Sequence, residues 1–148
     1  MQTFLPFPEF DASARTLDNK RLGKQRVETK QILNALTGHS KGWTNHPATK
    51  MWRGYEYALC SYGAAICWEW QRRGFKDTLF DFFSRAIAEY EQDGQRFVPP
   101  PWLGDDIIHA SHRSNLLRKD PLWYGQFGWR EPDHLPYVWP PSKEDLIH

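Results

Sequence analysis

The sequence predicts a single compact all-α domain built around one long central helix. With 148 residues and 40% hydrophobic content, the chain is long enough to form one hydrophobic core. Four segments repeat apolar residues at spacings of three and four, which is the period of an amphipathic helix. Pro and Gly separate these segments and recur in an extended, aromatic C-terminal tail. We therefore expect one domain over residues 1–148, without a sheet of three or more strands.

The first helix is expected to run to about Leu36. Asp11 or Ser13 can cap its start, and Gly38 stops it. Its apolar and small residues share one face, which contains Ala14, Leu22, Thr29, Ile32, Leu33 and Leu36. This face should lie against the core.

The second helix is expected to run from Pro47 to Arg73 and to be the central one. Pro suits the first turn of a helix, and Gly74 follows the last periodic position. At 1.5 Å per residue, a helix of this length would measure about 40 Å. Its apolar stripe consists of Met51, Tyr55, Leu59, Tyr62, Ile66 and Trp70.

Two further helices and an aromatic tail complete the expected fold. Asp77 or Thr78 can cap the third helix, whose apolar positions are Leu79, Phe82, Phe83, Ala86, Ile87 and Tyr90. The stretch "DGQRFVPPPWLG" ends it, and "DDIIHASHRSNLLRK" predicts a fourth, shorter helix before Pro121. The remaining tail has too many Pro and Gly for regular structure, but it carries Trp123, Tyr124, Phe127, Trp129, Tyr137 and Trp139. We expect it to wrap around the helices.

A basic stripe on the first helix is the main candidate for function. Between Lys20 and Lys30, five cations surround one acid, Glu28. Spacings of three and four place Arg21, Lys24, Glu28 and Gln31 on one side of the helix. One interpretation is a solvated face with an ordinary Lys24–Glu28 pair that contributes about 0.3 kcal/mol. The other is a surface whose cations bind nucleic-acid phosphates while the single carboxylate moves protons.

Two more segments carry candidate phosphate contacts. Asn45 and His46 precede the expected helix at Pro47, and amide groups at a helix N-terminus can hold a phosphate. The stretch "HASHRSNLLRK" adds His109, His112, Arg113, Arg118 and Lys119 on or near another helix. For each His, a capping or packed side chain is the alternative interpretation.

Several classes of protein are excluded by missing patterns. The sequence lacks the Gly-rich phosphate loop of an NTPase and the Ser elbow of a hydrolase. His109 and His112 have no partners at metal-ligand spacing, and Cys60 and Cys67 are too far apart for a disulfide, so we expect no metal site and two reduced thiols. No apolar run approaches the roughly 18 residues of a membrane span, and "MQTFLPFPEF" does not resemble a signal peptide. We expect a soluble, cytoplasmic protein.

Segments along most of the chain resemble the pyrimidine-dimer DNA glycosylase/AP lyase family, also called endonuclease V. The resemblance rests on the helix with a Glu among basic residues, on "ALCSYGAAICWEWQRRGFKDT", and on "DPLWYGQFGW" after the helix with His and Arg. Three further segments, "LDNKRLGKQRVE", "NHPATKMW" and "LPYVWP", resemble a phage and actinobacterial branch of this family.

The resemblance implies a helical DNA-repair fold with the N-terminus in the active site. In this family the terminal amine attacks C1′ of the damaged nucleotide and forms an imine, a Glu assists, and elimination cuts the strand. It further implies a monomer that needs no metal or organic cofactor and acts on double-stranded DNA containing a damaged or modified base. Which base is recognised stays open, since a pyrimidine dimer and a hypermodified phage base both fit.

Carried onto this sequence, the resemblance marks Met1, Gln2 and Glu28 as candidate catalytic residues. The candidate DNA-binding residues are Arg21, Lys24, Arg26, Gln31, Asn45, His46, His112, Arg113 and Lys119. The family has a small second residue that is exposed when Met is removed, whereas the bulk of Gln2 protects Met1 from the aminopeptidase. Either Met1 supplies the amine or the terminus has lost its role.

The position of the acid has an alternative as well. An alignment made on the Lys24–Gln25 pair would place Gln25 where the family has its carboxylate. We favour Glu28, because it keeps the core positions Ile32 and Leu36 in phase. Two other functions remain open: a nucleic-acid or nucleotide-binding protein of the same fold without lyase chemistry, and an interaction module whose aromatic tail binds another protein.

Overall fold

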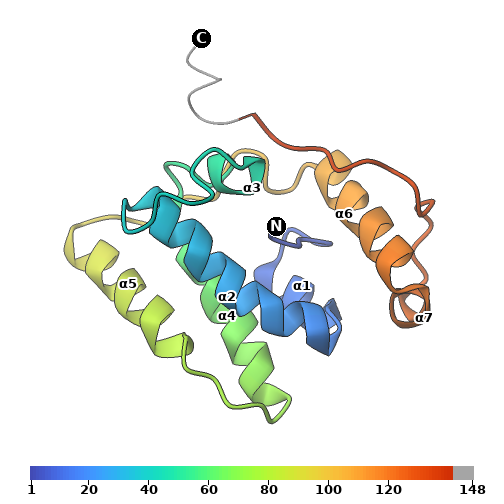
Figure 1. The fold of residues 1–148 in the computed structure, drawn as a ribbon, viewed down its shortest axis with the longest axis horizontal. Helices are drawn as coiled ribbons and strands as arrows, with labels where there is room; N and C mark the ends of the chain where they lie inside the picture. The colour runs from blue at the N-terminus through green and yellow to red at the C-terminus, as the bar shows by residue number, and fades with distance from the viewer. Residues whose placement is uncertain (142–148) are drawn as a thin grey trace.

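The fold is all-helical over residues 1–141, the part of the chain that the computed structural model describes (Figure 1). No strand occurs within these residues, so the predicted fold class is confirmed. The helices are α1 (Phe10–Thr16), α2 (Asn19–Leu36), α3 (Pro47–Lys50), α4 (Glu56–Arg72), α5 (Phe80–Gln92), α6 (Asp106–Lys119) and α7 (Pro121–Tyr124), followed by a 3-10 turn at Gly125–Phe127.

The core is organised around α4, which packs against α1, α2 and α5. Its residues Leu59, Tyr62 and Ile66 are completely buried. Gly63 lets α5 approach closely, because a Cβ atom at this position would lie 2.6 Å from the ring of Phe83. The helix predicted to be central is therefore central, with its apolar stripe turned inward.

The first expected helix is divided into α1 and α2. Leu17 has an extended backbone (φ −69°, ψ 141°), and Asp18 begins a new helix by accepting a hydrogen bond from the Arg21 N–H at 3.4 Å. The prediction of one continuous helix was wrong because an Asp that can cap overrides an apolar pattern that continues through the break. The break also buries Leu17 in the core.

The second expected helix is also divided, into α3 and α4. Residues 51–54 form turns, and Gly54 has a left-handed backbone with φ 88°. Gly adopts this conformation without the steric cost that other residues incur, so it ends a helix where apolar spacing alone predicts continuation. The central helix α4 has 17 residues and measures about 25 Å, not the 40 Å expected. Its end near Gly74 was predicted correctly.

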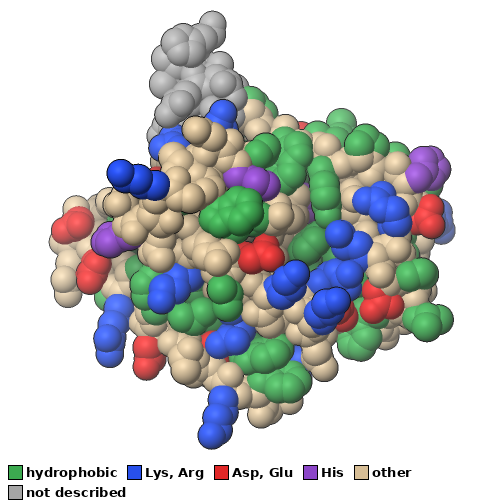
Figure 2. Space-filling model, viewed as in Figure 1, with side chains coloured by type: hydrophobic (Ala, Val, Ile, Leu, Met, Phe, Trp, Pro, Cys, Tyr) green, Lys and Arg blue, Asp and Glu red, His purple; other side chains and the backbone are tan. Residues whose placement is uncertain are grey.

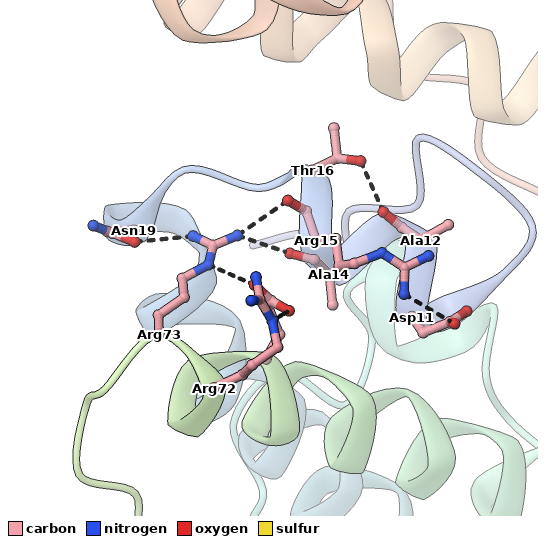
Figure 3. Close-up of polar contacts among 9 residues, drawn as sticks. Asp11, Ala12, Ala14, Arg15, Thr16, Asn19, Arg72 and Arg73 are labelled. Carbon is pink, nitrogen blue, oxygen red and sulfur yellow. Dashed lines mark hydrogen bonds and ion pairs between the residues drawn. The ribbon is translucent and has the colours of Figure 1, made fainter.

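Arg73, directly after α4, fixes the start of α2 (Figure 3). Its guanidinium donates to the carbonyl oxygens of Ala14 and Arg15, both at 3.2 Å, and to Asn19 Oδ1 at 2.9 Å. Glu69, which is 2% exposed, accepts from Arg73 Nε at 2.8 Å and completes the contact. This cluster holds the α1–α2 break against the end of α4.

The aromatic tail runs along α6, as Figure 1 shows. The backbone N–H groups of Leu135 and Val138 donate to Ser114 Oγ and Ser111 Oγ at 2.9 and 3.1 Å, so two hydroxyl groups of α6 bind the tail. The expected wrapping is confirmed for residues 121–141, and the rest of the tail lies outside the described residues. One turn of helix, α7, was not expected; Asp120 caps it by accepting from the Trp123 N–H at 3.1 Å.

The two cysteines are buried in α4 and carry no disulfide, as predicted. Burial raises the pKa of both Cys60 and Cys67 to about 12. Both therefore remain protonated thiols at neutral pH.

Candidate active site

The N-terminal segment lies between the helices (Figure 1) and is largely buried. Side chains of α2 and α4 bind its backbone. Gln25, which is 1% exposed, accepts from the Phe4 N–H at 3.0 Å and donates to the Gln2 carbonyl oxygen at 2.7 Å. The Tyr62 hydroxyl lies 2.8 Å from the Phe4 carbonyl oxygen, and Trp52 Nε1 donates to Thr3 Oγ1 at 3.0 Å. Residues 2–4 are thus held on two sides.

Helix α6 binds the next residues of the same segment. His112 Nδ1 accepts from the Leu5 N–H at 2.9 Å, and His109 Nδ1 lies 2.8 Å from the Leu5 carbonyl oxygen. His109 Nε2 accepts from the Gly104 N–H, so its proton resides on Nδ1 and is donated to Leu5. Arg113 donates to the Pro6 carbonyl oxygen at 2.8 Å. These contacts fix the direction in which the chain emerges at residue 1.

Glu28 lies where the N-terminal segment reaches the surface. The Gln2 N–H donates to Glu28 Oε2 at 3.3 Å, which places Met1 directly beside the carboxylate. Both residues line a cleft of about 250 Å³, whose other walls are Gln2, Phe4, Lys20, Arg21, Lys24, Gln25, Lys119 and Tyr137. Among residues 1–141 no Lys24–Glu28 ion pair forms, so the pairing expected of an ordinary helix face is wrong.

Cations from two helices surround this cleft. Lys20, Arg21 and Lys24 come from α2, and Lys119 comes from the end of α6. Burial and the charges of neighbouring cations lower the pKa of Lys119. Figure 2 shows Lys and Arg side chains gathered over the start of α2 and toward α6. The arrangement concentrates positive potential at the mouth of the cleft.

Arg21 is held in place by a buried carboxylate. Asp18 Oδ1 accepts from Arg21 Nη1 at 3.2 Å and from the Tyr124 hydroxyl at 2.5 Å. Burial acts to raise the pKa of Asp18, but the hydrogen bonds from Tyr124 and Arg21 outweigh it and bring the pKa below its usual value. Asp18 therefore stays ionised and couples the aromatic tail to the cleft.

Three further aromatic side chains extend the cleft wall. Tyr137 contacts Trp139 with ring centroids 5.7 Å apart, and Trp139 contacts His46 at 5.9 Å. On its other side, His46 contacts Trp43 at 5.6 Å. Burial and the charge of the N-terminal amine lower the pKa of His46, whereas Glu28 opposes this, so His46 lies within electrostatic range of both groups. Trp43 was not predicted as a site residue, although it is an aromatic residue in the polar loop "TGHSKGWTNHP".

Comparison with known protein families identifies the chain. A family model described as pyrimidine dimer DNA glycosylase matches residues 1–82. The chain belongs to the pyrimidine dimer DNA glycosylase family. It is accordingly a DNA glycosylase whose substrate is DNA with damaged bases. Searches of curated proteins and of solved structures find no match.

The glycosylase family match and the cleft overlap only in part. Met1, Gln25 and Glu28 lie within the matched residues, together with α2 and α4. Lys119 and Tyr137, which close the cleft from the other side, lie beyond the match.

Two predicted DNA contacts of the glycosylase are occupied by acidic partners. Arg26 pairs with Asp77 at 2.7 Å, and its guanidinium lies over the ring of Trp70. Arg113 pairs with Glu131 at 2.7 Å, in addition to its contact with the N-terminal segment. Both arginines hold parts of the fold together, through partners too distant in the sequence to be predicted.

His112 is also placed differently from its prediction. Its ring is 1% exposed and packs against Phe4 and Tyr137, with centroids 6.3 and 5.9 Å away. Burial, with the nearby His109 and Arg113, lowers its pKa to about 3, so the ring is neutral. The structure therefore shows the packed histidine that was the alternative interpretation.

The remaining candidates lie on the surface near α2 and α3. Gln31 is exposed beside a second hollow along α2, which shares Lys20, Lys24 and Glu28 with the cleft. Asn45 is exposed in the loop before α3. The helix N-terminus that was expected to hold a phosphate at Pro47 belongs to a helix of only four residues, and its Ala48 N–H already donates to His46 Nδ1 at 3.0 Å.

The described residues contain no cluster of three or more His, Cys, Asp or Glu side chains that could hold a metal ion. Among the helices of this part of the chain, none combines the length and apolar character needed to cross a membrane.

Proposed function

We propose that this DNA glycosylase also has AP-lyase activity and forms an imine between the amine of residue 1 and C1′ of the target nucleotide. The observation that carries the proposal is the hydrogen bond from the Gln2 N–H to Glu28, which brings the first residue and one carboxylate together in a cationic cleft. We further propose that residues 1–148 act as one domain on double-stranded DNA.

The chemistry needs a nucleophile and a group that moves protons. The amine nitrogen bonds to C1′ while the C1′–base bond breaks, and the base leaves with the electron pair and takes up a proton. Glu28 accepts a proton from the attacking nitrogen, the sugar C1′–O4′ bond breaks with its electron pair and a proton going to O4′, and the imine forms between the nitrogen and C1′. Removal of a C2′ proton then expels the 3′ phosphate and cuts the strand.

The surrounding structure supports both steps by holding the reactants in place. Side chains from three helices bind the backbone of residues 2–6, so the amine is positioned before DNA binds. Lys20, Lys24 and Lys119 have no carboxylate within ion-pair distance among the described residues, which leaves them available to phosphates.

Borohydride trapping on duplex DNA with one abasic site tests this proposal. The reduced cross-link should join the DNA to residue 1 of the mature chain, and peptide mass should identify that residue as Met1. An uncleaved N-terminal extension should abolish trapping while DNA affinity changes only a few fold. Trapping through an internal residue such as Lys24 would contradict the amine mechanism, and salt-dependent DNA binding without nicking would indicate a protein that only binds.

A further inference from the structure

The sulfur atoms of the chain are divided between the core and the cleft. The sequence contains two methionines and two cysteines. Met51 is 2% exposed, and Cys60 and Cys67 are completely buried, so solvent does not reach these three side chains. Met1 is only half-buried and lines the cleft together with Glu28. Met1 therefore carries the sulfur atom that a small molecule in solution can reach.

The buried sulfur atoms are also protected from oxidation by their chemical state. A cysteine reacts with peroxides as the thiolate, and only where the oxidant can reach it. Burial raises the pKa of Cys60 and Cys67 to about 12, so both stay protonated. A thioether has no proton to lose and reacts at neutral pH in its ordinary form. Exposure alone therefore decides which methionine is oxidised, and it favours Met1 over Met51.

Met1 is held next to the reacting groups by the contacts of the following residue. Gln2 is 4% exposed; its N–H donates to Glu28 Oε2 at 3.3 Å, and its carbonyl oxygen accepts from Gln25 Nε2 at 2.7 Å. Met1 itself packs against the hydrophobic core. Its side chain and its amine therefore share one cleft of about 250 Å³ with the Glu28 carboxylate. An atom added to the side chain is added beside the amine.

We infer that Met1 is a site of reversible oxidation by peroxides, and that conversion of its thioether to the sulfoxide inactivates the cleft. This inference rests on the proposed function, in which the amine of residue 1 is the nucleophile. The sulfur attacks one oxygen of hydrogen peroxide, so that an S–O bond forms while the O–O bond breaks. The other oxygen leaves as hydroxide and takes the proton of the transferred oxygen to become water. The sulfur is thereby oxidised and the peroxide reduced.

The added oxygen changes the cleft although it adds no net charge. A thioether is a weak hydrogen-bond acceptor, whereas a sulfoxide is polar and accepts strongly. Its oxygen can bind the amine of its own residue or a neighbouring lysine, such as Lys24. The polar side chain also packs less well against the core. Both effects move the amine, and a misplacement of about 1 Å can cost about 100-fold in rate.

Treatment with hydrogen peroxide, followed by single-turnover cleavage of a duplex with one abasic site, tests the inference. Peptide mass should show one added oxygen on Met1 and none on Met51. The oxidised protein should cleave about 10- to 100-fold more slowly, because the amine is displaced. DNA affinity should stay within about threefold, because the cations that attract phosphates are unchanged. Methionine sulfoxide reductases, one for each epimer, should restore the rate.

Two variants serve as controls. Met51→Leu replaces the buried methionine by a residue of similar volume, and peroxide should inactivate it as it does the wild type. Ile107→Met places a methionine at a position that is 68% exposed at the start of α6 and does not line the cleft. This variant should take up a second oxygen without a further loss of rate.

The other outcomes contradict separate statements. Complete oxidation of Met1 without loss of rate would overturn the inference and leave the lyase proposal intact. The inference would also fail if Met1 stayed unoxidised under conditions that oxidise the added methionine of Ile107→Met, or if the untreated protein lacked Met1. Failure of the untreated protein to cut the abasic duplex would overturn the proposed function itself.

Discussion

At the scale of single residues, Gln25 and Glu28 have different tasks although they lie three positions apart on α2. Gln25 is buried and must both accept and donate, because it faces the Phe4 N–H and the Gln2 carbonyl oxygen. A carboxylate cannot donate, so Glu at position 25 would leave the carbonyl oxygen without a partner. Glu28 is only half-buried and borders the cleft. These environments favour Glu28 as the acid. The sequence favoured the same residue, because that alignment keeps the core positions Ile32 and Leu36 in phase.

Glu28→Gln tests this assignment. If Glu28 moves protons during catalysis, the near-isosteric change should slow strand cleavage by about 10² to 10⁴, the usual range for general acid-base catalysis. DNA affinity should hold or rise, because a negative charge leaves a surface that faces phosphates. Single-turnover cleavage of abasic DNA and equilibrium binding measure the two quantities.

Gln25→Ala is the control for that experiment. It should lower the free energy of unfolding by about 2 to 3 kcal/mol, because it leaves buried polar groups of the N-terminal segment unsatisfied. A rapid Glu28→Gln enzyme together with a stable but inactive Gln25→Ala variant would move the active site back three residues along α2.

At the scale of elements, the errors of sequence-based prediction occurred at helix ends. The apolar spacing of α1 with α2, and of α3 with α4, continues across each break, so periodicity alone predicts longer helices. A local signal marked each break. The Asp18 carboxylate caps the start of α2, and Gly54 adopts a left-handed backbone before α4. The basic stripe was predictable from spacing, but the acidic partners of Arg26 and Arg113 were not, because they lie 51 and 18 positions away.

The contact of the tail with α2 leads to a prediction for Tyr124. Its hydroxyl donates to Asp18 Oδ1, and its ring stacks on Trp129 at 5.7 Å. Tyr124→Phe keeps the stacking but removes the hydrogen bond, so Arg21 loses part of its support. We expect a loss of about 1.5 to 3 kcal/mol in the free energy of unfolding, as for other hydrogen bonds to charged groups.

DNA binding should weaken roughly three- to tenfold in the same variant, because one charged contact is held less firmly. Urea denaturation and salt-matched DNA titration measure the two effects. Tyr57→Phe is the control, since it removes an exposed hydrogen bond to Glu91 far along the chain from the cleft. Unchanged binding in Tyr124→Phe would show that Arg21 does not depend on the tail.

At the scale of the whole molecule, the N-terminal segment joins three helices that are distant in the sequence. Gln25 of α2, Tyr62 of α4 and His112 of α6 all bind backbone groups within residues 2–5. Nothing in the local sequence predicts this, because each side chain would serve equally well as a surface or core residue. The same contacts that position the amine therefore also stabilise the fold. Loss of any one contact should affect both the position of the amine and the free energy of unfolding.

The buried histidine of this assembly predicts acid sensitivity. His112 must be neutral to accept from the Leu5 N–H, and its pKa is lowered to about 3, mainly by burial. Below the ordinary histidine pKa of about 6.5, the unfolded chain binds a proton that the native protein does not. The free energy of unfolding should therefore decrease as the pH is lowered from about 6.5 to 3, by roughly 1.4 kcal/mol per pH unit for this group.

His112→Asn separates this effect from the titration of carboxylates. An Asn oxygen can accept from the Leu5 N–H without taking up a proton. The slope of the free energy of unfolding against pH, measured between pH 6.5 and 5, should therefore be smaller in the variant by about 1.4 kcal/mol per pH unit. The lowered pKa of His109 leaves a residual slope in the variant. Urea denaturation at several pH values measures the slope, and His39→Asn, at an exposed position, should leave it unchanged. An equal slope in wild type and His112→Asn would mean that His112 takes up its proton without opening the structure around the N-terminal segment.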